Sequence, residues 1–174
     1  MNLPNLLSAF RLVLVPLFAR VYFLPDPNAH TWAALIYALA FLTDILDGWI
    51  ARHFNMVTRL GRMLDPLADK LMTLTVIVCV ALDGVIPLWA IAVFLCKELA
   101  MVLGGAILVR RVGDVITANW WGKISTGVFF VVLALLVLFP IPRPWSTAMI
   151  TLALATAIAA FLRYGVDFLK ILRK

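Results

Sequence analysis

The stretch "TDILDGWIARHFNMVTRLGRMLDPLADKL", residues 43–71, places Asp44, Asp47, Asp65 and Asp69 in a chain that is otherwise mostly apolar. Asp44 and Asp47 are three positions apart, and Asp65 and Asp69 are four apart, so each pair shares one face of a helix. A short loop between two antiparallel helices would let the two acidic faces meet. Carboxylates that meet in a low dielectric repel one another strongly unless a positive charge compensates. The stretch therefore predicts a cation-binding site.

Ligand chemistry narrows the choice of cation. Carboxylate oxygens, with no His or Cys in the cluster, favour a hard divalent cation such as Mg²⁺ or Mn²⁺ over zinc. Two cations fit four carboxylates better than one, and Mg²⁺ sites are commonly completed by substrate phosphates. The alternative is that the aspartates pair with nearby basic residues as a charged network at the membrane edge. Those basic residues are Arg52, Arg59, Arg62 and Lys70.

The residues between the two acidic pairs suit a phosphate-bearing ligand. Gly48 and Ala51 lie beside Asp47 on the predicted helix and remove bulk where a ligand could approach the backbone. Arg52 offers a planar guanidinium that matches phosphate geometry. Gly61 allows a close turn before the second acidic pair. These features favour a bound phosphate ester over a purely structural charge network.

The composition is that of an integral membrane protein. Of the 174 residues, 64% are hydrophobic and 14% are charged, whereas soluble domains average about 45–50% apolar and about 25% charged residues. Several apolar runs reach the roughly 20 residues that cross a bilayer as a helix. We predict an all-α, multi-pass membrane protein with one domain over residues 1–174, a short N-terminal interfacial helix and six transmembrane helices. The spans are expected at approximately 10–25, 31–53, 63–83, 86–109, 120–139 and 146–168.

Lys and Arg residues gather at one set of predicted helix ends, which assigns that side to the cytoplasm. Arg52, Arg110 and Lys170 lie on this side, whereas only Arg20 and Arg143 lie near the other. An even number of spans then puts both termini and the acidic stretch at the cytoplasmic face. The net charge of +6 accordingly indicates cytoplasmic loops and anionic lipid head groups as its partners, and not nucleic acid.

Written out, the acidic stretch reads D-x2-D-G-x2-A-R-x8-G-x3-D-x3-D, and it resembles the signature of the CDP-alcohol phosphotransferase family at every fixed position. "LPNLLSAFRLVLVP", residues 3–16, and "LDPLADKL", residues 64–71, are similar to segments of the bacterial phosphatidylglycerophosphate synthases in that family. The resemblance covers the chain and is strongest over residues 1–75. It implies a six-helix protein of the bacterial cytoplasmic membrane, usually a homodimer, with a polar cavity that faces the cytoplasm.

The resemblance also implies roles for individual residues. Asp44, Asp47 and Asp65 would hold one metal, and Asp44, Asp65 and Asp69 would hold the second. Asp69 would be the general base, which takes the proton of an acceptor hydroxyl as it attacks the β-phosphorus of CDP-diacylglycerol. The metals would stabilise charge on the diphosphate and on the leaving CMP. The CDP moiety would lie against Gly48, Ala51, Arg52, Thr58 and Gly61, with a further contact from Asn5.

The acceptor is expected to be glycerol 3-phosphate, whose phosphate suits Arg110, Arg111, Lys123 and Arg163. These four cations could equally be charges that only set the topology. One departure keeps an alternative open: typical phosphatidylglycerophosphate synthases carry an Arg-Glu pair and a later arginine in the fourth span. Here the pair is Lys97-Glu98, and "LGGAIL", residues 103–108, has no arginine. A CDP-diacylglycerol-dependent cardiolipin synthase, with phosphatidylglycerol as acceptor, is therefore the closest alternative.

A divalent-cation transporter is a more distant alternative, since carboxylates within a membrane also serve ion paths. The acidic residues gather at one membrane edge, and the chain has no second acidic set to continue a path. The sequence therefore favours an enzyme over a transporter.

Overall fold

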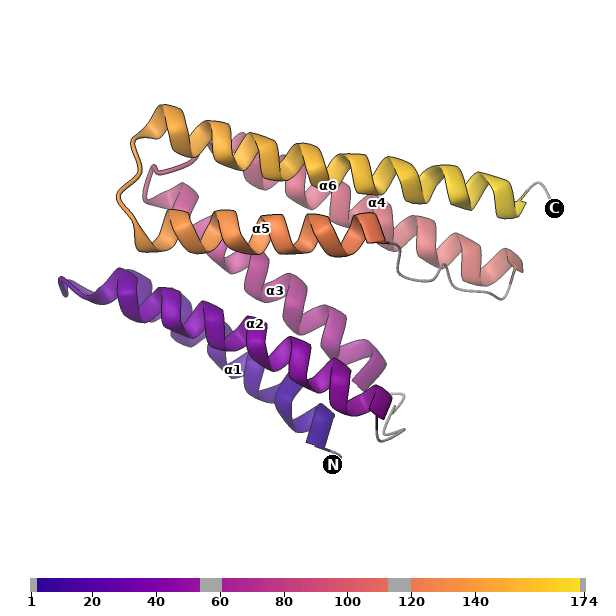
Figure 1. The fold of residues 1–174 in the computed structure, drawn as a ribbon, viewed down its shortest axis with the longest axis horizontal. Coiled ribbons are helices and arrows are strands. Elements are labelled where there is room, and N and C mark those ends of the chain that lie inside the picture. The colour runs from indigo at the N-terminus through magenta and orange to yellow at the C-terminus, as the bar shows by residue number, and fades with distance from the viewer. Residues whose placement is uncertain (1–2, 54–60, 113–119, 173–174) are drawn as a thin grey trace. The chain divides into compact units, whose positions relative to one another are not determined.

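Six helices form the structure, a computed structural model that describes residues 3–53, 61–112 and 120–172 (Figure 1). Side chains at 3–4, 51–52, 62–63, 105–106, 108–112 and 167–172 lie outside this description. The all-α prediction is confirmed for the described residues. The helices are α1 (Leu3–Tyr22), α2 (Ala29–His53), α3 (Gly61–Leu82), α4 (Trp89–Val112), α5 (Trp120–Leu138) and α6 (Arg143–Leu172).

The first helix differs from its prediction. The sequence predicts a separate interfacial helix over residues 1–10, but residues 3–10 are the first turns of α1, which continues unbroken to Tyr22. Pro4 lies in the first turn, where its missing N–H has no intrahelical partner to lose. The following residues "NLLSAF" contain neither Gly nor Pro to end the helix. The membrane-length part of α1 therefore begins near Asn5, earlier than expected.

Within the part of the chain that the structure describes, four helices are long and apolar enough to cross a membrane: α1, α2, α5 and α6. Helices α3 and α4 have 22 and 24 residues, which also suffices for a bilayer core of about 30 Å. Both carry several charges, including Asp65 and Asp69 on α3 and Lys97 and Glu98 on α4. The structure thus supports a membrane protein with four candidate spans, and the spans of α3 and α4 remain predictions.

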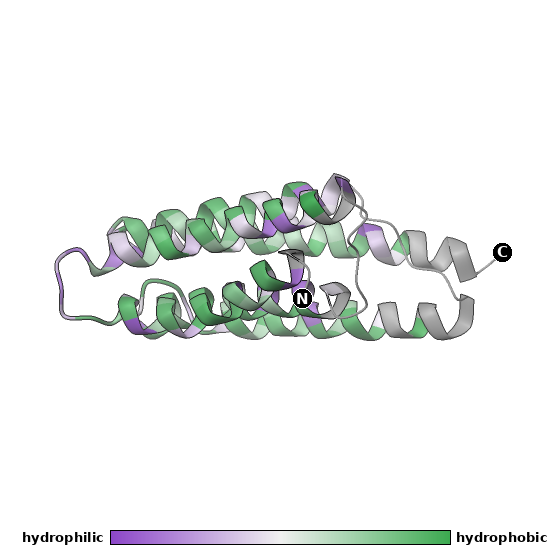
Figure 2. Cartoon of the chain, turned by 90° about the horizontal axis from the view of Figure 1, so that it is seen from below, coloured by the Kyte–Doolittle hydropathy of each residue, from purple (hydrophilic) through white to green (hydrophobic). Residues whose placement is uncertain are grey.

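The outward surface of the helices is apolar (Figure 2). Val13 on α1, Leu42 on α2, Val102 on α4 and Leu152 on α6 are all more than half exposed. Soluble monomers rarely expose contiguous apolar patches of more than a few hundred Å². Such surfaces are favourable in a lipid bilayer, where apolar side chains contact hydrocarbon and not water.

Two compact units make up the chain. Unit 1 comprises Met1–Asp83 and Leu133–Pro140, so it holds α1, α2, α3 and the end of α5. Unit 2 comprises Gly84–Val132 and Ile141–Lys174, with α4, α6 and the rest of α5. Gly84, which follows α3, has a φ of 76°, a left-handed conformation that glycine adopts without steric cost.

In unit 1, α1 packs against both α2 and α3. Buried residues recur every three or four positions along each helix, which is the spacing of one helical face. The phenol of Tyr22 at the end of α1 donates a hydrogen bond of 3.2 Å to Oδ2 of Asp83, just beyond α3. The core stripe consists of Leu14, Phe18 and Tyr22 on α1, Ala33, Tyr37 and Ala40 on α2, and Ala68, Met72 and Val76 on α3.

In unit 2, α4 packs against α6. The rings of Phe94 on α4 and Phe129 on α5 lie 5.6 Å apart between centroids. The buried hydroxyl of Ser146 lies within hydrogen-bonding distance of the carbonyl oxygens of Val85 and Arg143 and can donate to either of them. This contact joins the start of α6 to the segment before α4.

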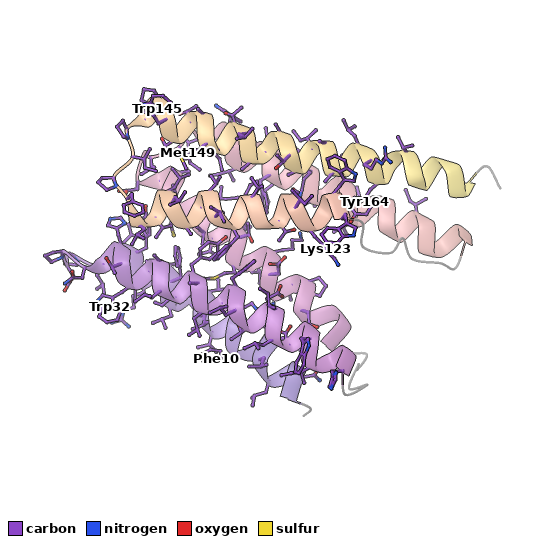
Figure 3. The ribbon with its side chains drawn as sticks, in the orientation of Figure 1. Phe10, Trp32, Lys123, Trp145, Met149 and Tyr164 are labelled. Atoms are coloured by element: carbon purple, nitrogen blue, oxygen red, sulfur yellow. The ribbon has the colours of Figure 1, made fainter. Side chains whose placement is uncertain are left out.

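Exposed tryptophans mark the ends of the helices in unit 2. Trp89 begins α4, Trp145 lies near the start of α6, and Trp120 and Trp121 begin α5. Since α5 runs antiparallel to α4 and α6, these side chains lie at both ends of the unit (Figures 1 and 3). Tryptophan is enriched at both membrane–water interfaces, so this distribution fits helices that cross a bilayer.

The contact between Gly122 on α5 and the side chain of Tyr164 on α6 supplies a test of the packing in unit 2. A Cβ added to Gly122 would lie 2.5 Å from the hydroxyl oxygen of Tyr164, where α5 and α6 adjoin (Figure 3). We expect Gly122→Ala to destabilise the protein by about 1–3 kcal/mol, as overpacked sites generally do. The measurement is the thermal unfolding of the purified protein in detergent.

Gly127→Ala on the same helix is the matched control, because nothing lies within 4 Å of the added Cβ. That variant should be as stable as the original or up to about 1 kcal/mol more stable, since alanine is the better helix former. Tyr164→Phe should recover part of the loss in Gly122→Ala. Equal melting temperatures for both alanine variants would contradict the packing described here.

Candidate active site

The core stripe of unit 1 becomes polar at one end. Helix α1 runs antiparallel to α2, and α3 follows α2 after a short connection, so the beginning of α1, the end of α2 and the beginning of α3 lie at the same end (Figure 1). On each helix the apolar stripe continues, at the same three- or four-residue spacing, into polar residues or glycine. This polar end consists of Asn5, Ser8, Arg11, Thr43, Asp47, Gly61 and Asp65.

The guanidinium of Arg11 on α1 pairs with two aspartates of α2. Nη1 of Arg11 lies 2.6 Å from Oδ1 of Asp44, and Nη2 forms an ion pair with Oδ2 of Asp47. The side chains of Arg11 and Asp47 are 1% and 2% exposed, whereas that of Asp44 is 37% exposed. Because a buried charge is costly unless it is paired and hydrogen-bonded, Arg11 and Asp47 each make the burial of the other possible.

A second contact joins α1 to α3. The hydroxyl of Ser8, which is fully buried, donates a hydrogen bond to Oδ1 of Asp65. Ser8 and Arg11 are three positions apart, so they project from the same face of α1. One helix face thus contacts carboxylates of both α2 and α3. Asp44 and Asp65 also lie near enough to Asp47 for their negative charges to act on it.

Arg11 and Ser8 were not among the site residues that the sequence analysis predicted. One signal was present: Arg11 is the single charged residue in the apolar run "LLSAFRLVLVP", residues 6–16. A cation at membrane depth is expected to face a partner within the protein. The aspartates of α2 are such partners, so this rule could have predicted that they pair with Arg11.

Asp69 is the second carboxylate of α3. It follows Asp65 by one helical turn, and its side chain is 35% exposed. Lys70 Nζ lies 3.9 Å from Asp69 Oδ2, an exposed pair of the kind that contributes little to stability. The hydroxyl of Thr73 donates to the backbone oxygen of Asp69, and Tyr37 on α2 lies within electrostatic reach of its carboxylate. A carboxylate that reaches solvent is suited to proton transfer.

The side chains at the predicted metal site have suitable donor atoms, but they do not form a compact group. Within the described residues, no three His, Cys, Asp or Glu side chains gather as they would around a metal ion. Arg11 supplies positive charge to Asp44 and Asp47 instead. The donors themselves are four carboxylates on facing helices, which is the ligand type that Mg²⁺ and Mn²⁺ prefer. The residues therefore fit a hard divalent cation by type.

The residues predicted to contact CDP are described in part. Asn5 is buried one turn before Ser8, Gly48 follows Asp47 directly, and Gly61 is buried at the start of α3. All three belong to the same end of unit 1 as the aspartates. The side chains of Ala51 and Arg52, and the whole of Thr58, lie outside the described residues.

The residues predicted to bind the acceptor belong to unit 2. Lys123 on α5 is exposed, with Nζ 5.5 Å from the centroid of the Trp120 ring, and Arg163 on α6 is exposed. Arg110 and Arg111 have no described side chains. On α4, Lys97 forms an ion pair with its chain neighbour Glu98.

Comparison with known proteins identifies the family of this chain. A model of the CDP-alcohol phosphatidyltransferase family matches residues 1–161. The CDP-diacylglycerol–glycerol-3-phosphate 3-phosphatidyltransferase of Bacillus subtilis is 33% identical over 153 residues, which cover 81% of this chain and 79% of the relative. A probable phosphatidylglycerophosphate synthase of Mycobacterium tuberculosis is 35% identical over 170 residues, covering 96% of this chain and 79% of the relative.

A third relative carries a different activity in its name. The cardiolipin synthase (CMP-forming) of Streptomyces coelicolor is 37% identical over 129 residues, which cover 72% of this chain and 60% of the relative. The family match and these identities show that the chain belongs to the CDP-alcohol phosphatidyltransferase family and is a membrane-bound transferase of phospholipid biosynthesis.

Proposed function

We propose that this protein transfers the phosphatidyl group of CDP-diacylglycerol to a hydroxyl of glycerol 3-phosphate and releases CMP. The observation that supports the proposal is the polar end of unit 1, where Arg11 on α1 pairs with Asp44 and Asp47 of α2. Ser8 on α1 donates to Asp65 of α3, and Asp69 follows Asp65 by one helical turn. Two relatives that cover most of the chain bear the names of enzymes with this activity.

In the proposed reaction, Asp69 accepts the proton of the acceptor hydroxyl as its oxygen attacks the β-phosphorus. A new P–O bond forms to the acceptor, the P–O bond to CMP breaks, and CMP leaves with the electron pair of that bond. Asp69 suits this role because its half-buried carboxylate still reaches solvent, whereas Asp47 is buried against Arg11. Gly48, Gly61 and Asn5, together with Ala51, Arg52 and Thr58, are the proposed CDP contacts.

The same reading assigns two divalent cations, Mg²⁺ or Mn²⁺, to Asp44, Asp47, Asp65 and Asp69. When bound, such ions stabilise negative charge on the diphosphate and on the leaving CMP. The protein is proposed to be a homodimer in the bacterial cytoplasmic membrane, with the four aspartates and both termini at the cytoplasmic face. The distribution of Lys and Arg supports that orientation.

Cardiolipin synthesis, with phosphatidylglycerol as the acceptor, is the second candidate function. Two observations favour it: the relative from Streptomyces coelicolor, and the absence of arginine from the α4 segment "LGGAIL". The proposed chemistry at the aspartates is unchanged, because both acceptors present a hydroxyl. Arg110, Arg111, Lys123 and Arg163 matter most for glycerol 3-phosphate, whose dianionic phosphate requires cations.

A CMP-release assay separates these functions. Purified protein in detergent would receive CDP-diacylglycerol and Mg²⁺, with glycerol 3-phosphate, phosphatidylglycerol, inositol phosphate or serine in parallel. We expect release with glycerol 3-phosphate and little above background with the others. Release only with phosphatidylglycerol would establish the second candidate. No release with any acceptor would contradict both functions, and it is the result expected of an ion transporter.

A further inference from the structure

We propose that Arg11 and Ser8 are positioning residues, which orient the aspartates of α2 and α3 so that they can hold the divalent cations. The inference rests on the proposed metal-dependent function, and it concerns residues outside the acidic signature. Arg11 and Ser8 lie on α1, whereas the signature runs from the end of α2 to the beginning of α3. The acidic stretch would then depend on a separate helix for its geometry.

The bonds from α1 use one oxygen of each carboxylate. Arg11 engages Oδ1 of Asp44 and Oδ2 of Asp47, and Ser8 engages Oδ1 of Asp65. A carboxylate has two oxygens with about four lone-pair sites in total, so each aspartate keeps acceptor capacity for a cation. Carboxylates that bind metals are generally hydrogen-bonded by such outer partners, and loss of a partner typically costs 10–100-fold in metal affinity.

The position of α1 makes these partners rigid. Arg11 and Ser8 are 1% and 0% exposed, and they continue the packed stripe of Leu14 and Phe18. Nε of Arg11 is buried and has no hydrogen-bond partner within the described part of the chain. The two Nη groups therefore determine where the guanidinium lies, and its planar fork relates Asp44 and Asp47 to each other.

The positive charge of Arg11 also affects the electrostatic repulsion between the aspartates. Without metal, Asp44, Asp47 and Asp65 would place three negative charges near one another, which is unfavourable at low dielectric. Arg11 offsets part of that repulsion while Ser8 holds Asp65. Replacing Arg11 by Lys keeps the positive charge but removes the planar fork that engages two carboxylates at once. The substitution therefore tests orientation separately from charge.

The experiment measures Mn²⁺ binding to the purified protein in detergent by electron paramagnetic resonance, without substrate. We expect Arg11→Lys and Ser8→Ala each to raise the Kd for Mn²⁺ about 10-fold or more. Arg20→Lys is the matched control, because Arg20 is also on α1 but is exposed at the far end of that helix. The Kd of this variant for Mn²⁺ should equal that of the original protein. CMP release by the two site variants should recover at saturating Mn²⁺, which a merely unfolded variant would not do.

Unchanged Mn²⁺ affinity in both site variants would overturn the inference. If Arg11→Lys fails to fold, as judged by its melting temperature, Ser8→Ala decides the question, because it removes one hydroxyl and no charge. Failure of the proposed function looks different: the original protein would bind Mn²⁺, with the same dependence on Arg11 and Ser8, and would release no CMP with any acceptor.

Discussion

Asp69→Asn is expected to reduce CMP release by at least about 100-fold while CDP-diacylglycerol still binds. General bases typically contribute 10²–10⁴-fold to rate, and an amide of the same shape cannot accept the proton. Its side-chain oxygen can still act as a neutral ligand, and the bond from Thr73 is kept because it goes to the backbone oxygen of residue 69. Turnover would be followed as CMP release at saturating Mg²⁺, and CDP-diacylglycerol binding by calorimetry in detergent.

The control for this variant is Asp83→Asn, which makes the same charge change just beyond the other end of α3. Asp83 accepts a hydrogen bond from Tyr22, and an amide oxygen can accept it too, so activity should remain near that of the original protein. If Asp69→Asn weakened CDP-diacylglycerol binding as much as turnover, the general-base role would be wrong. A structural or ligand-binding role would then describe Asp69 better.

Removal of divalent metal is expected to reduce the rate of CMP release by a factor on the order of 100 or more. Lewis-acid stabilisation of charge in the transition state contributes several kcal/mol, and each 1.36 kcal/mol corresponds to about tenfold in rate. After dialysis against a chelator, Mg²⁺ or Mn²⁺ should restore activity. Zinc should restore little, because the cluster offers neither His nor Cys. Full activity after thorough metal removal would refute the proposed metals.

The ion pairs of Arg11 predict that this loss is not caused by unfolding. Buried Asp47 has Arg11 as its counter-ion without any metal, so the chelated protein should melt within a few degrees of the metal-loaded one, apart from the stabilisation that any ligand gives. A cooperative loss of helix on chelation, followed by circular dichroism, would show that the metal and not Arg11 maintains the polar end of unit 1.

The acidic faces could be predicted from the sequence because they depend only on local geometry. Spacings of three and four place Asp44 with Asp47, and Asp65 with Asp69, on any α-helix. The choice of oxygen ligands follows in the same way from composition. The six helices also follow from local apolar runs, although their observed ends differ from the predicted ones. Helix α1 begins by Leu3 and includes the residues of the interfacial helix that was predicted separately.

The partners of those aspartates could not be predicted from spacing, because they come from another helix. Arg11 is separated from Asp44 and Asp47 by 33 and 36 positions, and Ser8 is separated from Asp65 by 57. Which side chains meet at such separations depends on how α1 is rotated and seated against α2 and α3. The approach of Tyr164 to Gly122 depends in the same way on the packing of α5 and α6.

The sequence by itself thus determined the helices, the family signature and the acidic face that each helix presents, since these are set by short-range geometry and composition. Only the tertiary structure decided that α1 supplies a buried guanidinium and a hydroxyl to the carboxylates. The physical reason lies in the cost of burying charge: Asp47 can lie in the packed interior only where a cation meets it. The packing of three helices brings Arg11 to that place.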